Sequence, residues 1–487
     1  MVKLRKEIAG LSRNIEARAA RFSGVIAGRA ARISALLLTG VIISRGAEAF
    51  TRALVGRHFG SEVLGLYSVT SAVIEISVGF ALFGLQNAVL RQYSARRPNG
   101  SSVFATSLVV TVGTALLAGV CLEVLSAGGL LRTLAPPAVA TIAASTAILC
   151  WFRLSASLMQ AMKFVLLDVV IEYSLFPVVR AACILVALLA AFSSADATAL
   201  GTGLAGGIAL VASFALPPIG PVIRKLVREP VRAPHVRSLI GFGFPLALAA
   251  IGELTMSQFD VLVLQGSVSA AAVGHYAAAV TIGRILFLLY GVAAFVYVPA
   301  FAATSPGAPQ LPHRERLEDF RLMSAVIAAT VSLLAAECVD LVFGVDFRDA
   351  ALPLAVLTVG YLGSNLLGFN SYHLIMRGRT TEYALSRIGA FLLGIAMYAI
   401  LIPTNGLVGA SLATSLMLIF GAASSALVSE RVLGTEPTPI SSLIYLLPAL
   451  AGVAMFGQPV VLRLGLLGAG IVLTGLARLK TKRETGP

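Results

Sequence analysis

The chain has 487 residues, of which 57% are hydrophobic and only 12% are charged, and its mean hydropathy is +0.90. Soluble domains carry about 25% charged residues, so this composition excludes a protein whose whole surface faces water. The sequence predicts an all-α integral membrane protein, because apolar runs of about 20 residues, long enough to cross a bilayer, follow one another with short breaks.

Residues 1–32 precede the first apolar run and are rich in Lys and Arg. Apolar side chains recur there at spacings of three, four or seven residues: Leu4, Ile8, Leu11, Ile15, Phe22 and Ile26. This pattern predicts a basic amphipathic helix on the surface of an anionic leaflet, with a disordered basic tail as the alternative. No small-residue cleavage site follows the first apolar run, so we expect no cleavable signal peptide.

Hydropathy and turn residues divide the rest of the chain into about fourteen transmembrane helices. The predicted spans are 33–56, 65–88, 103–127, 138–161, 169–192, 199–219, 238–262, 274–301, 320–342, 351–376, 382–402, 408–430, 441–458 and 460–478. The last two are short and could form one re-entrant pair, which would leave about twelve spanning helices.

The predicted spans group into two lobes of six helices and a final pair. The predicted domains are an N-lobe at 33–219, a basic cytoplasmic linker at 220–237, a C-lobe at 238–430, helices 13 and 14 at 431–478 and a cytoplasmic tail at 479–487.

Basic residues mark the orientation of these helices. Most of the 37 Lys and Arg lie in the two tails and in the even-numbered connections. The odd-numbered connections carry only four basic residues, namely Arg57, Arg132, Arg348 and Arg463. By the positive-inside rule, both termini should face the cytoplasm. The same bias accounts for the net charge of +14 without any nucleic acid partner.

The four cysteines and five histidines show no metal-ligand spacing. We therefore expect no metal site, and we expect the cysteines to be buried as small apolar side chains.

Two stretches of the sequence are alike at an offset of 209 residues. Leu64-Gly65-Leu66-Tyr67-Ser68 opens the second predicted helix, and Val273-Gly274-His275-Tyr276-Ala277 opens the eighth. Six helices separate the copies, so the copies share one orientation, and the lobes should be related by an axis along the membrane normal. In known transporters of this plan the binding site lies between the repeats.

Three blocks of sequence resemble the polysaccharide-flippase branch of the multidrug/oligosaccharidyl-lipid/polysaccharide (MOP) superfamily. The blocks are RALVGRHFGSEVLGLY at Arg52–Tyr67, the stretch from Phe242-Gly-Phe-Pro245 through Asp260 to Tyr276, and IPTNGLVGASLAT at Ile402–Thr414. Their order and spacing follow the family pattern over most of residues 33–430. The long basic tail at residues 1–32 departs from that pattern.

The resemblance implies two pseudo-symmetric six-helix lobes around a central cleft that opens alternately to the two sides of the membrane. It also implies a lipid-linked oligosaccharide, carried on a polyprenyl phosphate or pyrophosphate, as the substrate. Membrane lipids are the surrounding partners, and glycosyltransferases or a polymerase of the same pathway are further candidates. We expect a monomer without a cofactor. The resemblance does not identify the sugar.

Charged residues at membrane depth are costly, so those in the spans are candidates for function. Arg45, Glu48 and Arg52 share one face of the first helix at i, i+3 and i+7. Arg45 is the first candidate for phosphate recognition and Arg52 the second, because a guanidinium can bond two oxygens at once. Pairing of Glu48 with either arginine, which would only neutralise charge, is the alternative.

The seventh predicted helix carries a second stripe, formed by Glu253, Ser257 and Asp260 at i, i+4 and i+7. The repeat places this stripe opposite that of the first helix, so we expect both to line the cleft. Glu253 and Asp260 are candidates for binding the Na⁺ or H⁺ that drives transport, with pairing to the opposite arginines as the alternative. These acids leave the candidate residues without a clear cationic excess.

Glu75 and Arg284 occupy equivalent positions, each eight residues after the repeated tyrosine. Both lie about 15 Å into their helices, near the bilayer midplane. We expect them to form a gate across the cleft, with Arg284 released to the substrate phosphate when the gate opens. Pairing within each lobe is the alternative.

Five further charges lie near span ends or on outer helices, where snorkelling or pairing within a lobe is expected. They are Arg153, Asp168, Glu172, Arg180 and Arg387.

Other functions are less compatible with this pattern. A cation-coupled multidrug antiporter of the same fold is the main alternative, and a non-transporting membrane scaffold is an alternative of another class. An enzyme is not expected, because external loops of about 2 to 10 residues are too short to build a catalytic site. A nucleotide-driven pump is not expected either, because the chain has no G-x-x-x-x-G-K-[ST] loop.

Overall fold

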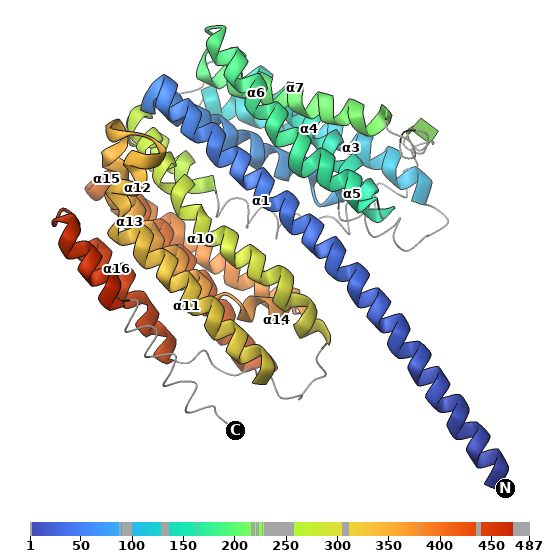
Figure 1. The fold of residues 1–487 in the computed structure, drawn as a ribbon. Coiled ribbons are helices and arrows are strands. Elements are labelled where there is room, and N and C mark those ends of the chain that lie inside the picture. Colours follow the sequence, from blue (N-terminus) through green and yellow to red (C-terminus); the bar gives the residue numbers. More distant parts are fainter. Residues whose placement is uncertain are drawn as a thin grey trace.

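The structure is a computed structural model of the 487-residue chain. It describes residues 2–86, 89, 100–127, 136–162, 164–215, 220, 224–225, 227, 258–303, 311–377, 379–434 and 440–470. All the regular elements in these ranges are helices, and they form two lobes that lie side by side (Figure 1).

The N-lobe contains the first six predicted helices. Its elements are α1 (Val2–Leu82), α3 (Gly100–Ala127), α4 (Pro136–Ala161), α5 (Val165–Asp168), the π-helix η1 (Val169–Leu175), α6 (Phe176–Leu189) and α7 (Ser194–Ala215). Although α1 is one assigned helix, Gly60 breaks it with a φ of 88° and a ψ of 177°. A side chain with a Cβ rarely adopts this φ, so glycine permits the turn between helices 1 and 2.

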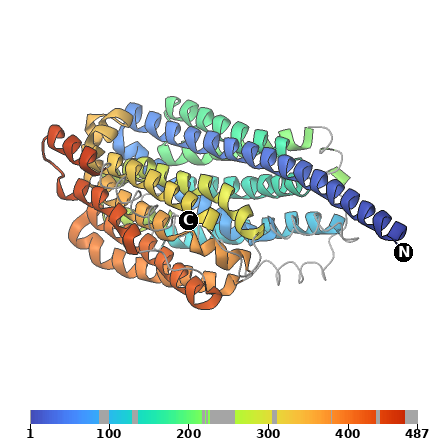
Figure 2. The same ribbon diagram turned by 60° about the horizontal axis from the view of Figure 1, so that its bottom comes forward.

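The C-lobe follows the same plan and carries the last helix pair on its far side (Figures 1 and 2). Its elements are α10 (Ala270–Ala303), α11 (Leu311–Leu333), α12 (Ala335–Val342), the 3₁₀ helix η2 (Val345–Ala350), α13 (Ala351–Leu367), α14 (Asn370–Met376), α15 (Thr380–Leu433), the 3₁₀ helix η3 (Ile440–Leu446) and α16 (Leu447–Ala454). Gly406 divides α15 in the same way, with a φ of 54°.

The predicted fold class is confirmed. Among the described residues, eight helices are long and apolar enough to cross a membrane, and two of them, Leu38–Leu82 and Thr381–Leu433, have 45 and 53 residues. Each of these two contains a glycine break and therefore supplies two spans. Two shorter apolar helices, Leu443–Ala454 and Val460–Gly470, match the final predicted pair. The described part of helix 7 begins at residue 258.

Some predicted spans are not single straight helices. The span 320–342 bends by 79° between Leu333 and Ala335, so α12 leaves the direction of α11. The span 351–376 is divided into α13 and α14, and the span 169–192 begins in a π-helix. Hydropathy did not predict these breaks because the apolar pattern continues across each of them. A π-helix is a local distortion that often occurs at functional sites.

Helix α1 begins at Val2, so the segment 1–32 is almost wholly helical and continues into helix 1 without a break. Figures 1 and 2 show this part of α1 projecting beyond the bundle. The opposite end of the bundle carries Gly60 and α12, and we call it the outer end, in keeping with the predicted orientation.

The two lobes meet at the repeated glycines near the outer end. A Cβ on Gly65 would lie 2.0 Å from the carbonyl oxygen of Ala270, and a Cβ on Gly274 would lie 1.8 Å from that of Ser61. Ser61 and Ala270 are themselves 209 residues apart, so the contact is reciprocal. The repeat seen in the sequence is thus a symmetric helix crossing that only glycine can occupy, because any side chain would collide with backbone.

Candidate functional site

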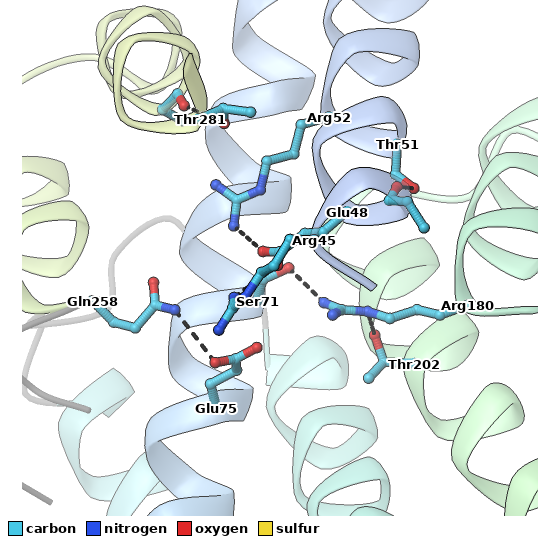
Figure 3. Close-up of polar contacts among 12 residues, drawn as sticks. Arg45, Glu48, Thr51, Arg52, Ser71, Glu75, Arg180, Thr202, Gln258 and Thr281 are labelled. Carbon is cyan, nitrogen blue, oxygen red and sulfur yellow. Dashed lines mark hydrogen bonds and ion pairs between the residues drawn. The ribbon is translucent and has the colours of Figure 1, made fainter. Parts of the chain in front are cut away.

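Glu48, on helix 1, is at the centre of a group of arginines. It accepts hydrogen bonds from Arg52 at 2.8 Å and from Arg45 at 3.2 Å. Arg284 from the C-lobe and Arg180 from α6 also lie within electrostatic reach of its carboxylate. The pairing that was the alternative for helix 1 is present in this state: Glu48 bonds both Arg45 and Arg52, and Figure 3 shows Arg180 near them.

The two arginines of helix 1 differ in their exposure. The side chain of Arg45 is 60% exposed, whereas that of Arg52 is 5% exposed and lies over the ring of Tyr67 at 5.8 Å. Arg52 is therefore held by aromatic and carboxylate contacts. Arg45 keeps most of its guanidinium free to meet an anion, which supports its rank as the first candidate.

Arg180 bonds within the N-lobe, as the sequence analysis expected, and it also lies within electrostatic reach of Glu48. Its Nη2 donates to the hydroxyl of Ser71 at 3.0 Å, and its Nε donates to the hydroxyl of Thr202 at 3.1 Å. Figure 3 shows its guanidinium extending from α6 towards Ser71 and the other charges. The long arginine stem carries the charge away from the position that the helix alone predicts. Its location in an apolar run was the signal that could have identified it.

Glu75 contacts the other lobe through an amide. Gln258, at the start of the described part of helix 7, donates from its Nε2 to Glu75 at 3.4 Å (Figure 3). Glu75 also lies within electrostatic reach of Arg153, Arg180 and Arg284. Since Gln258 and Glu75 come from different lobes, this bond links the two lobes at the level of Glu75.

Arg284 extends from α10 towards the same region. Its electrostatic partners, in decreasing order, are Tyr361, Glu48, Asp260 and Glu75. Both Glu48 and Glu75 are N-lobe groups, so Arg284 interacts across the cleft. The predicted gate between Glu75 and Arg284 is thus one contact within a larger group, and its role stays a prediction.

Asp260 is buried inside the C-lobe and has a different environment. Its Oδ1 accepts from the backbone N–H of Val261 at 2.8 Å, and its Oδ2 accepts from the hydroxyl of Tyr276 at 2.9 Å. Thr414 links Tyr276 to Tyr398 through contacts of 2.9 and 2.8 Å. These groups form a chain of hydroxyls that ends on a carboxylate, an arrangement suited to holding a proton or a small cation.

Thr414 is the final residue of the block Ile402–Thr414 that resembles the family signature. The sequence analysis gave it no role, yet its hydroxyl joins the eighth helix to the eleventh and twelfth, and Tyr276 continues the link to Asp260 on the seventh. Glu253, the other candidate for ion coupling, lies outside the described residues. Within the described ranges, no group of three or more His, Cys, Asp or Glu side chains could hold a metal ion.

The described charges at the cleft have a cationic excess. Four arginines bond Glu48 or lie within electrostatic reach of it, and Glu75 is a second carboxylate near them. Counting Asp260 as well leaves four arginines against three carboxylates. Arg153 forms a neutral pair with Glu172 in the N-lobe. Arg180 adds a fourth arginine to the three candidates from the sequence, and Glu253, the fourth candidate acid, lies outside the described residues and is not counted here.

A sequence model of the family described as "Polysaccharide biosynthesis protein" matches residues 31–305, which is more than half of the chain. This protein belongs to the polysaccharide biosynthesis protein family. The family belongs to the MOP superfamily, so the protein is a multi-pass membrane transporter of that superfamily. A search of curated proteins found no match.

Solved structures of the same superfamily share the fold. A lipid II flippase MurJ in an inward closed conformation superposes with a TM-score of 0.68 at 14% identity, covering 92% of this chain and 99% of that one. An inward-facing multidrug resistance MATE family transporter gives a TM-score of 0.56 at 16% identity, covering 82% of this chain and 94% of that one. A point mutant of the Vibrio cholerae MATE transporter VcmN gives 0.54 at 14% identity, covering 85% and 98%.

These identities are low, so the structural likeness establishes the fold and no substrate. Both flippases and multidrug transporters have this fold, as the names of the neighbours say. The family membership of the chain and the charges of its cleft therefore have to decide between them.

Proposed function

We propose that this protein flips a polyprenyl-phosphate- or pyrophosphate-linked oligosaccharide across the cytoplasmic membrane, for the assembly of a surface polysaccharide or glycan. The observation that carries the proposal is the group of arginines near Glu48: Arg45 and Arg52 bond its carboxylate, and Arg180 and Arg284 lie within electrostatic reach of it. A phosphate group is the natural ligand of such a cluster, because guanidinium groups bond its oxygens in pairs. Membership of the polysaccharide biosynthesis family supports the same class of substrate.

Substrate entry would exchange partners within the cluster. Arg45 is largely exposed and bonded to Glu48 at 3.2 Å, so a phosphate can bind it without displacing a buried contact. Arg284 and Arg180 could then approach the same anion from two sides. The sugar would occupy the aqueous cleft while the apolar polyprenyl chain stays in the lipid, since only the polar head is costly to move through hydrocarbon.

Energy coupling is a further part of the proposal. Asp260, sealed behind Tyr276, is the described carboxylate best placed to bind H⁺ or Na⁺ without meeting the substrate. A cation that binds only one state of the C-lobe would bias the alternation between the two openings.

The experiment is a translocation assay in proteoliposomes with a defined lipid-linked oligosaccharide, with and without H⁺ and Na⁺ gradients. Flipping of the pyrophosphate-linked substrate, but not of an uncharged glycolipid with the same sugar, is expected. Absence of flipping under all gradients would contradict the proposal.

A cation-coupled multidrug antiporter is the second candidate, favoured by the MATE-like fold and by the buried Asp260. The arginines grouped near Glu48 make this part of the protein unfavourable for a cationic drug, because like charges in a low-dielectric site repel strongly. The same proteoliposomes distinguish the two: an antiporter should move a cationic dye in exchange for protons, whereas the flippase should not.

A further inference from the structure

The last turn of α12, at the outer end of the C-lobe, has two carbonyl groups that its own lobe does not cap. The last four carbonyls of an α-helix have no partner within the helix. After Val342, the N–H groups of Phe343 and Gly344 turn back and donate to Val339 at 2.8 Å and to Asp340 at 3.1 Å. The carbonyls of Leu341 and Val342 are left for a donor from elsewhere.

Arg57 of the N-lobe supplies that donor. Its Nε donates to the carbonyl oxygen of Val342 at 2.8 Å, and its Nη2 donates to that of Leu341. The positive guanidinium also lies at the negative end of the helix dipole, where a cation is favourable. One side chain from the N-lobe therefore completes the cap of a C-lobe helix.

The surrounding backbone fits this contact closely. A Cβ on Gly56, the residue before Arg57, would lie 2.9 Å from the ring of Phe343 and 3.2 Å from that of Phe347. The reciprocal crossing of Gly65 and Gly274 belongs to the same inter-lobe surface. The outer ends of the lobes are thus closed by tight packing, and Arg57 adds the directional polar bonds.

We propose that Arg57 is a gate residue, whose bonds to the end of α12 hold the outer side closed and break when the lobes separate there. The inference rests on the alternating opening contained in the proposed function. Arg57 is exposed, so water can replace both carbonyl acceptors as the contact opens. A contact that exchanges with water at little cost can set the balance between two states without trapping either of them.

Two other outer arginines also bind α12 or its start, but they do so within the C-lobe. Arg348 pairs with Asp340 at 2.8 Å, and Arg463 pairs with Glu337 at 2.6 Å. Because both partners of each bond move with the C-lobe, these bonds should stay intact when the gate opens. Arg348 is therefore a matched control for Arg57: it has the same side chain, contacts the same helix and is also exposed.

The test measures how often the outer side opens. The four native cysteines, Cys121, Cys150, Cys183 and Cys338, are replaced by serine. Ser68, which is 2% exposed and lies one turn inside Gly65, is replaced by cysteine as a reporter. In proteoliposomes of a single orientation, a membrane-impermeant maleimide is added at the outer end. Its rate of reaction follows the fraction of molecules that are open, even when that fraction is small.

Arg57→Gln should raise the labelling rate about tenfold, the change expected for losing a charge-assisted bidentate contact. Arg57→Lys should give an intermediate rate, because an ammonium group keeps the charge but lacks the two-pronged geometry. Arg348→Gln should label within about twofold of the parent, because its contact does not cross the lobes.

Two outcomes would overturn the inference: an unchanged labelling rate in Arg57→Gln, or an equal increase in Arg348→Gln. The same proteoliposomes are assayed for oligosaccharide flipping in parallel. A parent protein that flips no lipid-linked oligosaccharide would count against the proposed function, whereas the ratio of labelling rates between the two variants tests the gate independently.

Discussion

The two lobes build opposite electrostatic environments on one repeated frame. Tyr67 of the N-lobe and Tyr276 of the C-lobe are equivalent and both are buried. The ring of Tyr67 lies under the guanidinium of Arg52, whereas the hydroxyl of Tyr276 donates to the carboxylate of Asp260. The N-lobe thus presents cations beside its tyrosine, and the C-lobe encloses an anion.

This difference shows how two structurally equivalent lobes can carry different functions. In the N-lobe, Arg45 is largely exposed and shares Glu48 with Arg52, so a ligand anion can replace the protein partner of Arg45. The C-lobe carboxylate of Asp260 is buried and accepts bonds from the hydroxyl of Tyr276 and the N–H of Val261, so it is less accessible to a substrate head group than Arg45 is. We infer that substrate recognition lies mainly in the N-lobe and energy coupling in the C-lobe.

A test of the orientation of the protein in the membrane has the largest expected effect, because a reporter fusion is either active or silent. The comparison requires both lobes to have the same direction in the membrane, with the tails on the cytoplasmic side. A reporter that is active only in the cytoplasm should be active when fused after Thr485 and silent when fused at Ser194, the first residue of α7. The opposite pattern of reporter activity would show that the topology is the reverse of the one predicted here.

Exchanging the charges of Glu75 and Arg284 gives the next largest effect. These equivalent positions carry opposite signs, and each charge has partners across the cleft. Glu75→Arg or Arg284→Glu alone should reduce flipping by about 100-fold or more, because each leaves uncompensated charge in a buried site. The double variant should recover much of the activity. A double variant no better than the worse single one would reject a direct pairing between these positions.

Removing Arg180 should have a smaller effect. Arg180→Ala deletes two bonds to hydroxyl groups, and we expect flipping to fall about tenfold while the protein still accumulates in the membrane. Arg180→Lys should recover part of the loss, because it restores the charge but not the fork. Ser71→Ala serves as the matched control, since it removes one acceptor and leaves the cation. If Arg180→Ala flips at the parental rate, Arg180 has no part in recognition.

Replacing Asp260 by Asn should change the response to an ion gradient more than transport itself. The amide keeps the size of the side chain but cannot bind a proton or neutralise a cation. Stimulation of flipping by the gradient, of about fivefold or more if coupling has its usual strength, should disappear, while substrate binding stays unchanged. Asp196→Asn, at a half-buried acid near the start of α7, is the control. Equal loss of binding and of stimulation would assign Asp260 a structural role.

Helices and symmetry could be predicted from the sequence because both depend on local patterns. Twenty apolar residues span a bilayer whatever their neighbours are, and the tyrosine repeat fixes the offset of 209 residues. The reciprocal packing of Gly65 and Gly274 shows that this offset relates real structural positions. The candidate group on helix 1 was also found, because Arg45, Glu48 and Arg52 share a face by helical spacing alone.

Partner choice could not be predicted in the same way. The group that contacts Glu75 is Gln258, a neutral residue that a search for charges overlooks. The sequence locates only the backbone of Arg180 on its helix. The guanidinium lies a side-chain length from that backbone, where it bonds Ser71. Arg57 counted only as an exception to the charge bias, and its role depends on the bend before α12 that hydropathy does not reveal. Long-range packing decides all three contacts.

The division of labour between the lobes is tested most directly by substrate affinity. Binding of a pyrophosphate-linked oligosaccharide to the purified protein should weaken at least about tenfold in Arg45→Ala, since a charged bond is lost. Arg45→Lys should fall between Arg45→Ala and the parent, and Asp260→Asn should bind within about twofold of the parent. Parental affinity in Arg45→Ala together with a large loss in Asp260→Asn would contradict the account, because the C-lobe would then carry the substrate site.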